Sequence, residues 1–68
     1  MNYFQLIAAC EWYLTAITKC RVTALTGLTD RYPQMSDSER HFIYGLPTSN
    51  FLITELQTAI KSFLLNHA

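Results

Sequence analysis

The stretch YFQLIAACEWYLTAITKCRVTALTGL, residues 3–28, decides the fold of this chain. Its apolar residues recur at steps of three and four, which is the spacing of one face of an α-helix. Asn2 precedes the stretch as a candidate N-cap, and Pro33 predicts that the helical segment ends by Tyr32. The residues of the main stripe are Leu6, Cys10, Tyr13, Ile17, Cys20, Ala24 and Leu28.

The second half of this stretch has a low helix propensity. β-Branched residues cluster there, and Gly27 weakens helix formation further. The segment is therefore expected to bend or divide between Lys19 and Gly27, and both one long helix and two shorter helices remain open. The β-branched residues are Thr15, Thr18, Val22, Thr23 and Thr26.

A second apolar stripe, Phe4, Ala8 and Trp12, projects well away from the main stripe. One interpretation is that the last helix, or a folded-back connector, covers Trp12 within the chain. The other is that the stripe anchors a dimer or a partner protein, because buried Trp and Tyr residues dominate interface energies. We favour the second interpretation, because a 68-residue domain cannot wrap a helix on all sides.

The segment Ser36-Asp37-Ser38-Glu39 predicts the start of a short helix. The Ser36 hydroxyl can accept from the backbone N–H of Glu39, while the Glu39 carboxylate reaches back to the N–H of Ser36. This helix should run from Asp37 to about Tyr44. Gly45 is expected to close it in the left-handed conformation, and Pro47 prevents its continuation.

A last helix is expected from about Ser49 to Asn66, with Thr48, Ser49 and Asn50 as candidate caps. Phe51 and Leu65 lie off its inward face, which adds them to Phe4, Ala8 and Trp12 as candidate partner or oligomer interface residues. The predicted fold is a single all-α domain over residues 1–68, a small helical hairpin or a three-to-four-helix domain, whose two long helices pack antiparallel. The inward face of the last helix is Leu52, Ile53, Leu56, Ala59, Ile60, Phe63 and Leu64.

The charge composition argues against several classes of function. Five basic and five acidic residues give a net charge of zero, and charged residues make up only 15% of the chain. No basic stripe is available to contact phosphates, so direct nucleic-acid binding is not expected. The N-terminal segment lacks the charged start of a signal peptide, and no apolar stretch approaches the length of a membrane span. We therefore expect a cytoplasmic protein that does not contact a membrane.

The chemistry-bearing residues do not form a recognisable site. Cys10, Cys20, His41 and His67 lack the paired spacing of metal ligands, so no metal or other cofactor is expected. Asp37 and Glu39 are explained by the helix cap, and no catalytic pair of carboxylates stands out, so the chain is not expected to be an enzyme.

The two cysteines are expected to be free and mostly buried. On one straight helix, Cys10 and Cys20 would lie roughly 15 Å apart. A disulfide requires its Cα atoms within about 7 Å, so an intrachain bond would need the helix to break.

Two fragments, Tyr13-Leu14 with Ile17 and Lys19-Cys20, and Ser36-Asp37-x-Glu39 with Ile43-Tyr44, resemble the haemolysin-expression-modulating family of small nucleoid-associated proteins. The resemblance implies an all-α chain of about this length that binds the oligomerisation domain of a histone-like silencing protein. The family is charge-rich where this chain has Gly45-Leu46-Pro47 and Phe51-Leu52-Ile53, so no functional residue is carried over.

Together these features predict a small helical adaptor or regulatory protein. It would act through a protein partner and through self-association, with a symmetric dimer as the default. The alternative, which the resemblance suggests, is a nucleoid-associated expression modulator that reaches DNA through a protein partner.

Overall fold

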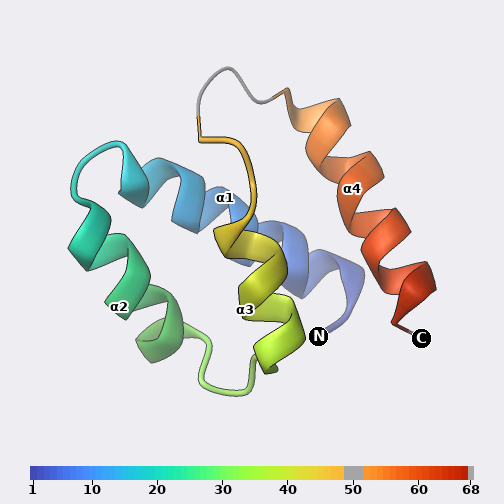
Figure 1. The fold of residues 1–68 in the computed structure, drawn as a ribbon, viewed down its shortest axis with the longest axis horizontal. Helices are drawn as coiled ribbons and strands as arrows, with labels where there is room; N and C mark the ends of the chain where they lie inside the picture. The colour runs from blue at the N-terminus through green and yellow to red at the C-terminus, as the bar shows by residue number, and fades with distance from the viewer. Residues whose placement is uncertain (49–51, 68) are drawn as a thin grey trace.

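Helix α1 (Tyr3–Ile17) lies between the other helices (Figure 1). The computed structural model describes residues 1–48 and 52–67, and these ranges contain helices and no strand. Helix α2 (Arg21–Arg31) and helix α4 (Ile53–Asn66) flank α1 and pack against it, and α3 (Asp37–Tyr44) crosses it. The predicted all-α class is confirmed.

The first helical stretch divides into two helices. The Asn2 side chain accepts from the Gln5 N–H at 2.8 Å, and the Gln5 side chain accepts from the Asn2 N–H at 2.9 Å. This capping box starts α1, as the N-cap prediction required. The chain leaves the helix after Ile17, and the extended backbone of Cys20 begins α2. Of the two alternatives left open by the sequence, the structure has two helices.

The core forms where α1 meets the other helices. Tyr13 is 2% exposed and lies 5.8 Å, between ring centroids, from Tyr44 on α3. The Tyr44 hydroxyl in turn donates to the carbonyl of Leu25 on α2, at 3.3 Å. The buried apolar residues are Leu6, Ala9, Cys10, Tyr13, Ala24, Leu28, Met35, Ile43, Leu46, Leu56, Ile60 and Phe63.

Two members of the predicted main stripe are not buried. Ile17 is half-buried, and Cys20 is exposed because it lies in the turn between α1 and α2 rather than on a continuous helix. The prediction that both cysteines are mostly buried is therefore wrong for Cys20 and confirmed for Cys10.

Helix α3 begins and ends where the sequence predicts. The Ser36 hydroxyl accepts from the Glu39 N–H at 3.2 Å, and the Glu39 carboxylate accepts from the Ser36 N–H at 2.8 Å. The predicted left-handed conformation of Gly45 is wrong, because its φ is −85° and its ψ is −3°. Its N–H donates to the carbonyl of His41 at 3.1 Å, which extends the helical turn instead of reversing it.

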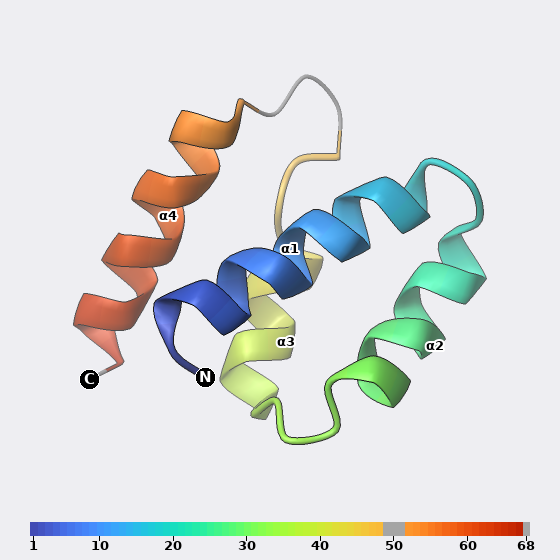
Figure 2. The same cartoon turned by 180° about the vertical axis from the view of Figure 1, so that it is seen from behind.

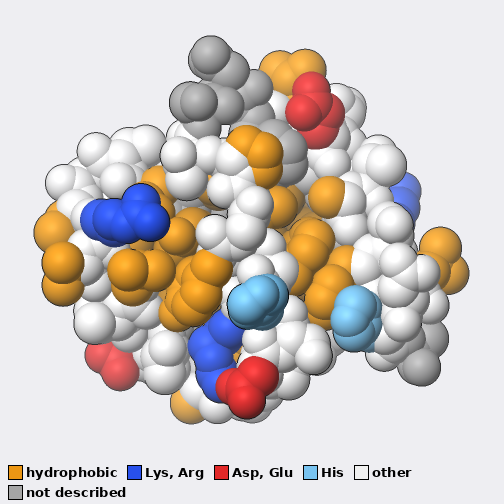
Figure 3. Space-filling view, viewed as in Figure 1, with side chains coloured by type: hydrophobic (Ala, Val, Ile, Leu, Met, Phe, Trp, Pro, Cys, Tyr) orange, Lys and Arg blue, Asp and Glu red, His pale blue; other side chains and the backbone are white. Residues whose placement is uncertain are grey.

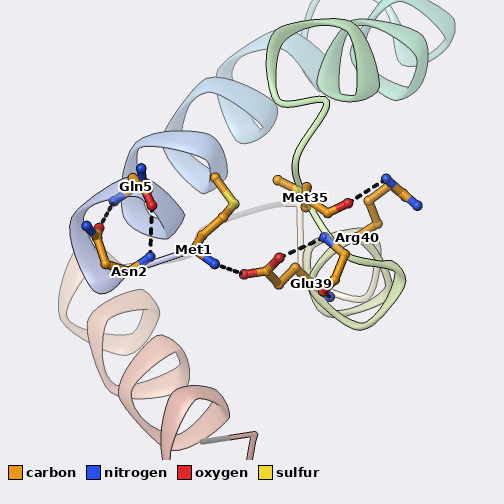
Figure 4. Close-up of polar contacts among 7 residues, drawn as sticks. Met1, Asn2, Gln5, Met35, Glu39 and Arg40 are labelled. Atoms are coloured by element: carbon orange, nitrogen blue, oxygen red, sulfur yellow. Dashed lines mark hydrogen bonds and ion pairs between the residues drawn. The ribbon is translucent and has the colours of Figure 1, made fainter.

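Glu39 also ties α3 to the start of α1. Its carboxylate accepts from the ammonium group of Met1 at 2.7 Å (Figure 4). Glu39 is only 7% exposed, so its charge would be costly without partners. The capping box and the ammonium group together satisfy it.

Helix α4 starts later than predicted. Leu52 is extended and Ile53 is the first helical residue, whereas the sequence favoured a start at about Ser49. The candidate caps Ser49 and Asn50 lie outside the described residues, and Thr48 is exposed and not helical.

Leu52 and Ile53, at the start of α4, do not contribute to the core. Leu52 is 60% exposed and Ile53 is 48% exposed, so both are wrongly assigned to the inward face. The reason is that the start of α4 lies away from α1, while its C-terminal half lies beside the start of α1 (Figure 2). The two helices run in roughly opposite directions, as predicted, but α2 occupies the other flank of α1.

We predict that Glu39→Gln lowers stability in a pH-dependent way. Burial raises the pKa of the Glu39 carboxyl, but hydrogen bonds from the Met1 ammonium and from Ser36 outweigh burial and lower it overall. A lowered pKa in the folded state stabilises the fold at pH values above the usual carboxyl range, and this stabilisation is lost as pH falls through the folded-state pKa. The glutamine keeps an oxygen for the Ser36 N–H but loses the charge.

Urea unfolding at pH 7 should therefore show the variant to be about 1.5–3 kcal/mol less stable than the parent. At pH 3 the difference should shrink. Glu55→Gln, at an exposed position on α4, is the control and should change little at either pH. A difference that stays constant with pH would contradict a charged role for Glu39.

Candidate functional site

Two large apolar side chains lie outside the core and are mostly exposed to solvent. Phe4 on α1 is 77% exposed and Leu65 on α4 is 80% exposed, the largest values among the large hydrophobic residues that the structure describes. Phe4 belongs to the first turn of α1 and Leu65 to the last turn of α4. The end of α4 passes beside the start of α1 (Figure 2).

Three further side chains connect Phe4 to Leu65. The Tyr3 ring packs edge-on against Phe4 with a centroid distance of 5.4 Å. The ammonium group of Lys61 lies 5.9 Å from the centroid of the same ring, a cation–π contact. Tyr3, Lys61, Leu64 and Leu65 line an open and almost wholly apolar groove of about 470 Å³. We call Tyr3, Phe4, Lys61, Leu64 and Leu65 the α1–α4 surface.

The structure sorts the predicted interface residues into three groups. Phe4 and Leu65 share the α1–α4 surface, and Ala8 is exposed one turn after Phe4. Phe51 lies outside the described residues. Trp12 lies elsewhere and belongs to the interior packing of the chain.

Trp12 packs against α2. A Cβ atom placed on Gly27 would lie 2.6 Å from Cη2 of the indole, so the ring approaches the helix at the one residue that leaves room for it. The guanidinium carbon of Arg31 lies 5.2 Å from the centroid of the indole ring. Trp12 is therefore covered within the chain, but the cover is α2 and not the last helix or a folded-back connector, as the alternative above expected. We correct its assignment to the interface.

Sequence reasoning missed Tyr3, Lys61 and Leu64 as members of the surface. The apolar periodicity places Leu64 on the inward face of the last helix, and nothing local in the sequence marks Tyr3 or Lys61 as interface residues. Only the placement of the end of α4 beside the start of α1 brings them together, and no local pattern encodes that placement.

A second groove separates α3 from α4. Phe63 lies 4.6 Å from Phe42 and 4.1 Å from the His67 ring, between centroids, and the three rings form a row. Nδ1 of His67 lies 2.9 Å from the carbonyl oxygen of Phe63, which fixes the imidazole at the helix end. Figure 3 shows hydrophobic side chains along this seam with a histidine on each side. The row packs α3 against α4. His67 is one of its rings, and His41 lines the same groove.

The two cysteines differ in reactivity. Burial, with a smaller contribution from the charge of Glu11, raises the pKa of the Cys10 thiol to about 12. Cys20 is exposed at the N-cap of α2, and hydrogen bonds with the side chain and backbone of Thr23 lower the pKa of its thiol. Cys20 is therefore the accessible nucleophile of the pair.

Three further ionisable residues stabilise the start of α3. Asp37 pairs with Arg40 in the first turn of α3, and Glu39 completes the capping box. Within residues 1–48 and 52–67, no three His, Cys, Asp or Glu side chains gather where they could hold a metal ion. Over the same residues, none of the helices has the length and apolar character needed to span a bilayer.

Comparison of the chain with protein-family models, with curated proteins and with solved structures found no match. Four of the residues behind the resemblance to the haemolysin-expression-modulating family have structural roles here. Tyr13 and Ile43 are buried in the core, and Ser36 and Glu39 form the helix cap. The α1–α4 surface is therefore the candidate functional site.

We predict that one thiol per chain reacts rapidly in the folded protein. A thiol reagent at pH 7 should label Cys20 quickly, whereas Cys10 should react only after denaturation, because burial keeps it protonated and inaccessible. Cys20→Ser should abolish the rapid phase. Rapid labelling of two thiols in the folded protein would remove Cys10 from the core.

We also predict that the effect of Gly27→Ala changes sign with the residue at position 12. In the parent chain the new methyl group meets the indole, and the overpacking should cost about 1–3 kcal/mol of unfolding free energy. In a Trp12→Ala background the methyl group meets no ring, and the alanine should stabilise α2 by up to about 1 kcal/mol. Chemical denaturation of the four proteins measures both effects. Stabilisation in both backgrounds would mean that Trp12 does not lie over Gly27.

Proposed function

We propose that this protein is a small helical adaptor or regulatory protein that binds other proteins, a second copy of itself included, through the α1–α4 surface. The observation that carries the proposal is that Leu65, 80% exposed, lines an open apolar groove together with Tyr3, and that Phe4, 77% exposed, packs against the Tyr3 ring.

The surface is contiguous, and this separates it from ordinary exposed hydrophobic residues. Single exposed apolar side chains are normal on soluble proteins, but contiguous patches mark interaction sites. An aromatic residue can bury about 150–250 Å² on association, so Phe4 and Tyr3 offer a large apolar area at one place. The lone charge of the surface, Lys61, is held over an aromatic ring.

The composition of the surface supports binding rather than catalysis. It offers two aromatic rings, two leucines and one ammonium group. Aromatic residues are enriched at the centres of protein interfaces, where a few of them supply most of the binding energy. We therefore propose a non-enzymatic role without a cofactor.

Two global features support self-association and a reducing compartment. The net charge of zero gives two copies no long-range repulsion. The exposed thiol of Cys20 suits the cytoplasm, where thiols are kept reduced.

We predict that Phe4→Ser and Leu65→Ser weaken self-association. If Phe4 is a hot spot, its truncation should cost about 2 kcal/mol or more of association free energy. Sedimentation equilibrium over a wide concentration range gives the dissociation constants, and the thermal midpoint of the parent should rise with concentration.

Val22→Ser is the matched control, because Val22 is 69% exposed but lies on α2. It should leave the dissociation constant nearly unchanged. A parent chain that stays monomeric at every concentration contradicts self-association. A dimer that both serine variants leave intact would place the binding surface elsewhere.

A further inference from the structure

We propose that the partner is a second copy of the chain, bound with the two α1 helices antiparallel. The outer face of α1, which carries Phe4, Ala8 and Glu11, would lie against the same face of the second copy. Lys61 of each copy would then lie opposite Glu11 of the other. This inference rests on the proposed self-association and adds its geometry.

The outer face of α1 is a continuous exposed stripe. Phe4, Ala8, Glu11 and Thr15 recur at steps of four, three and four, and all four are exposed. Leu6, Cys10 and Tyr13 occupy the opposite, buried face. In the view of Figure 2, α1 passes in front of α3 with α2 and α4 on its two sides. The outer face is therefore the side of α1 that these helices leave uncovered.

The charges on this face have opposite signs at its two ends. Glu11 is the only charged side chain of α1. Seven residues before it, about 10 Å along the helix axis, Phe4 lies beside Tyr3, and the Tyr3 ring holds the ammonium group of Lys61. The face thus carries a positive charge at its start and a negative charge two turns later.

The charge patterns of two copies are complementary only when their α1 helices run antiparallel. A two-fold axis perpendicular to α1 and close to Ala8 exchanges the two ends of the face. Each Lys61 then lies level with Glu11 of the other copy, and the contact is formed twice. A parallel arrangement would place like charges at the same level instead. Among the residues described, Glu11 and Lys61 take part in neither of the two ion pairs, so both are available.

The sizes of the side chains fit the same arrangement. Ala8 lies near the proposed axis, where a small side chain lets two helices approach to about 8–10 Å between their axes. Phe4 and Leu65 of both copies then close over the two ends. A standard interface buries about 800 Å² on each partner, which is about a fifth of the 4476 Å² surface of this chain. A two-fold contact of this kind closes on itself and forms no filament.

A charge exchange tests the pairing. Glu11→Lys and Lys61→Glu, made singly, should each raise the dissociation constant of the dimer about tenfold, because each places like charges together at two symmetric positions. The double variant Glu11→Lys/Lys61→Glu restores opposite charges and should return to within about threefold of the parent. Asp30→Lys, the same charge change at an exposed site on α2, is the control and should shift the constant less than about twofold.

A cross-link gives an independent measurement. In a Cys20→Ser background, Ala8→Cys should oxidise to a covalently linked dimer, because positions near a two-fold axis bring their Cα atoms within the reach of a disulfide. Val22→Cys in the same background should not. This readout needs no change of charge.

The outcomes separate the two proposals. If Phe4→Ser weakens the dimer but the double charge variant fails to recover and Ala8→Cys does not cross-link, the antiparallel pairing is wrong and the binding surface stands. If the parent chain is monomeric at every concentration, both self-association and this pairing fail. Recovery in the double variant together with the Ala8→Cys cross-link establishes the pairing.

Discussion

The turn at Thr18–Cys20 is the constraint on which the arrangement of the other helices depends. The Thr18 hydroxyl donates to the carbonyl of Thr15 at 2.7 Å, and Cys20 is extended, so the chain leaves α1 and α2 returns beside it. Trp12 then packs over Gly27, where the absence of a side chain allows close approach. Without this reversal the main apolar stripe would continue along one helix, and the flank of α1 that carries Trp12 would have no cover.

Glu39 illustrates how a small domain accommodates a charge in its interior. A buried carboxylate is costly unless hydrogen bonds and an opposite charge satisfy it. Here the Ser36 N–H and the Met1 ammonium group supply both, and one residue caps α3 and holds the start of α1 against it. Since Tyr3 and Phe4 follow directly in the sequence, the same contact positions the aromatic half of the α1–α4 surface.

The sequence predicts those features that depend on neighbours within a few residues. Both capping boxes act over three residues, and the starts of α1 and α3 follow from them. The covering of Trp12 depends on tertiary contacts, and periodicity contains no information about those. Gly45 is an exception among the local features, because its N–H bonds to His41 within the last turn of α3 and continues the right-handed conformation. Phe4 and Leu65 could each be identified as misplaced apolar residues, because helix geometry alone shows which face they occupy. Their membership of one surface required the packing of α4 against α1.

The uncovered side of α1 follows from the size of the chain. A domain of this length buries a smaller fraction of its surface than a larger one does, and in the part of the chain that the structure describes α2, α3 and α4 leave one side of the central helix α1 open. Helices α2 and α4 take its flanks and α3 crosses the buried face, which leaves Phe4, Ala8 and Glu11 outward. In the proposed dimer the second copy supplies the missing fourth neighbour. Folding and assembly are then coupled, because burying Phe4 on association stabilises only chains in which α1 and α4 are already packed together.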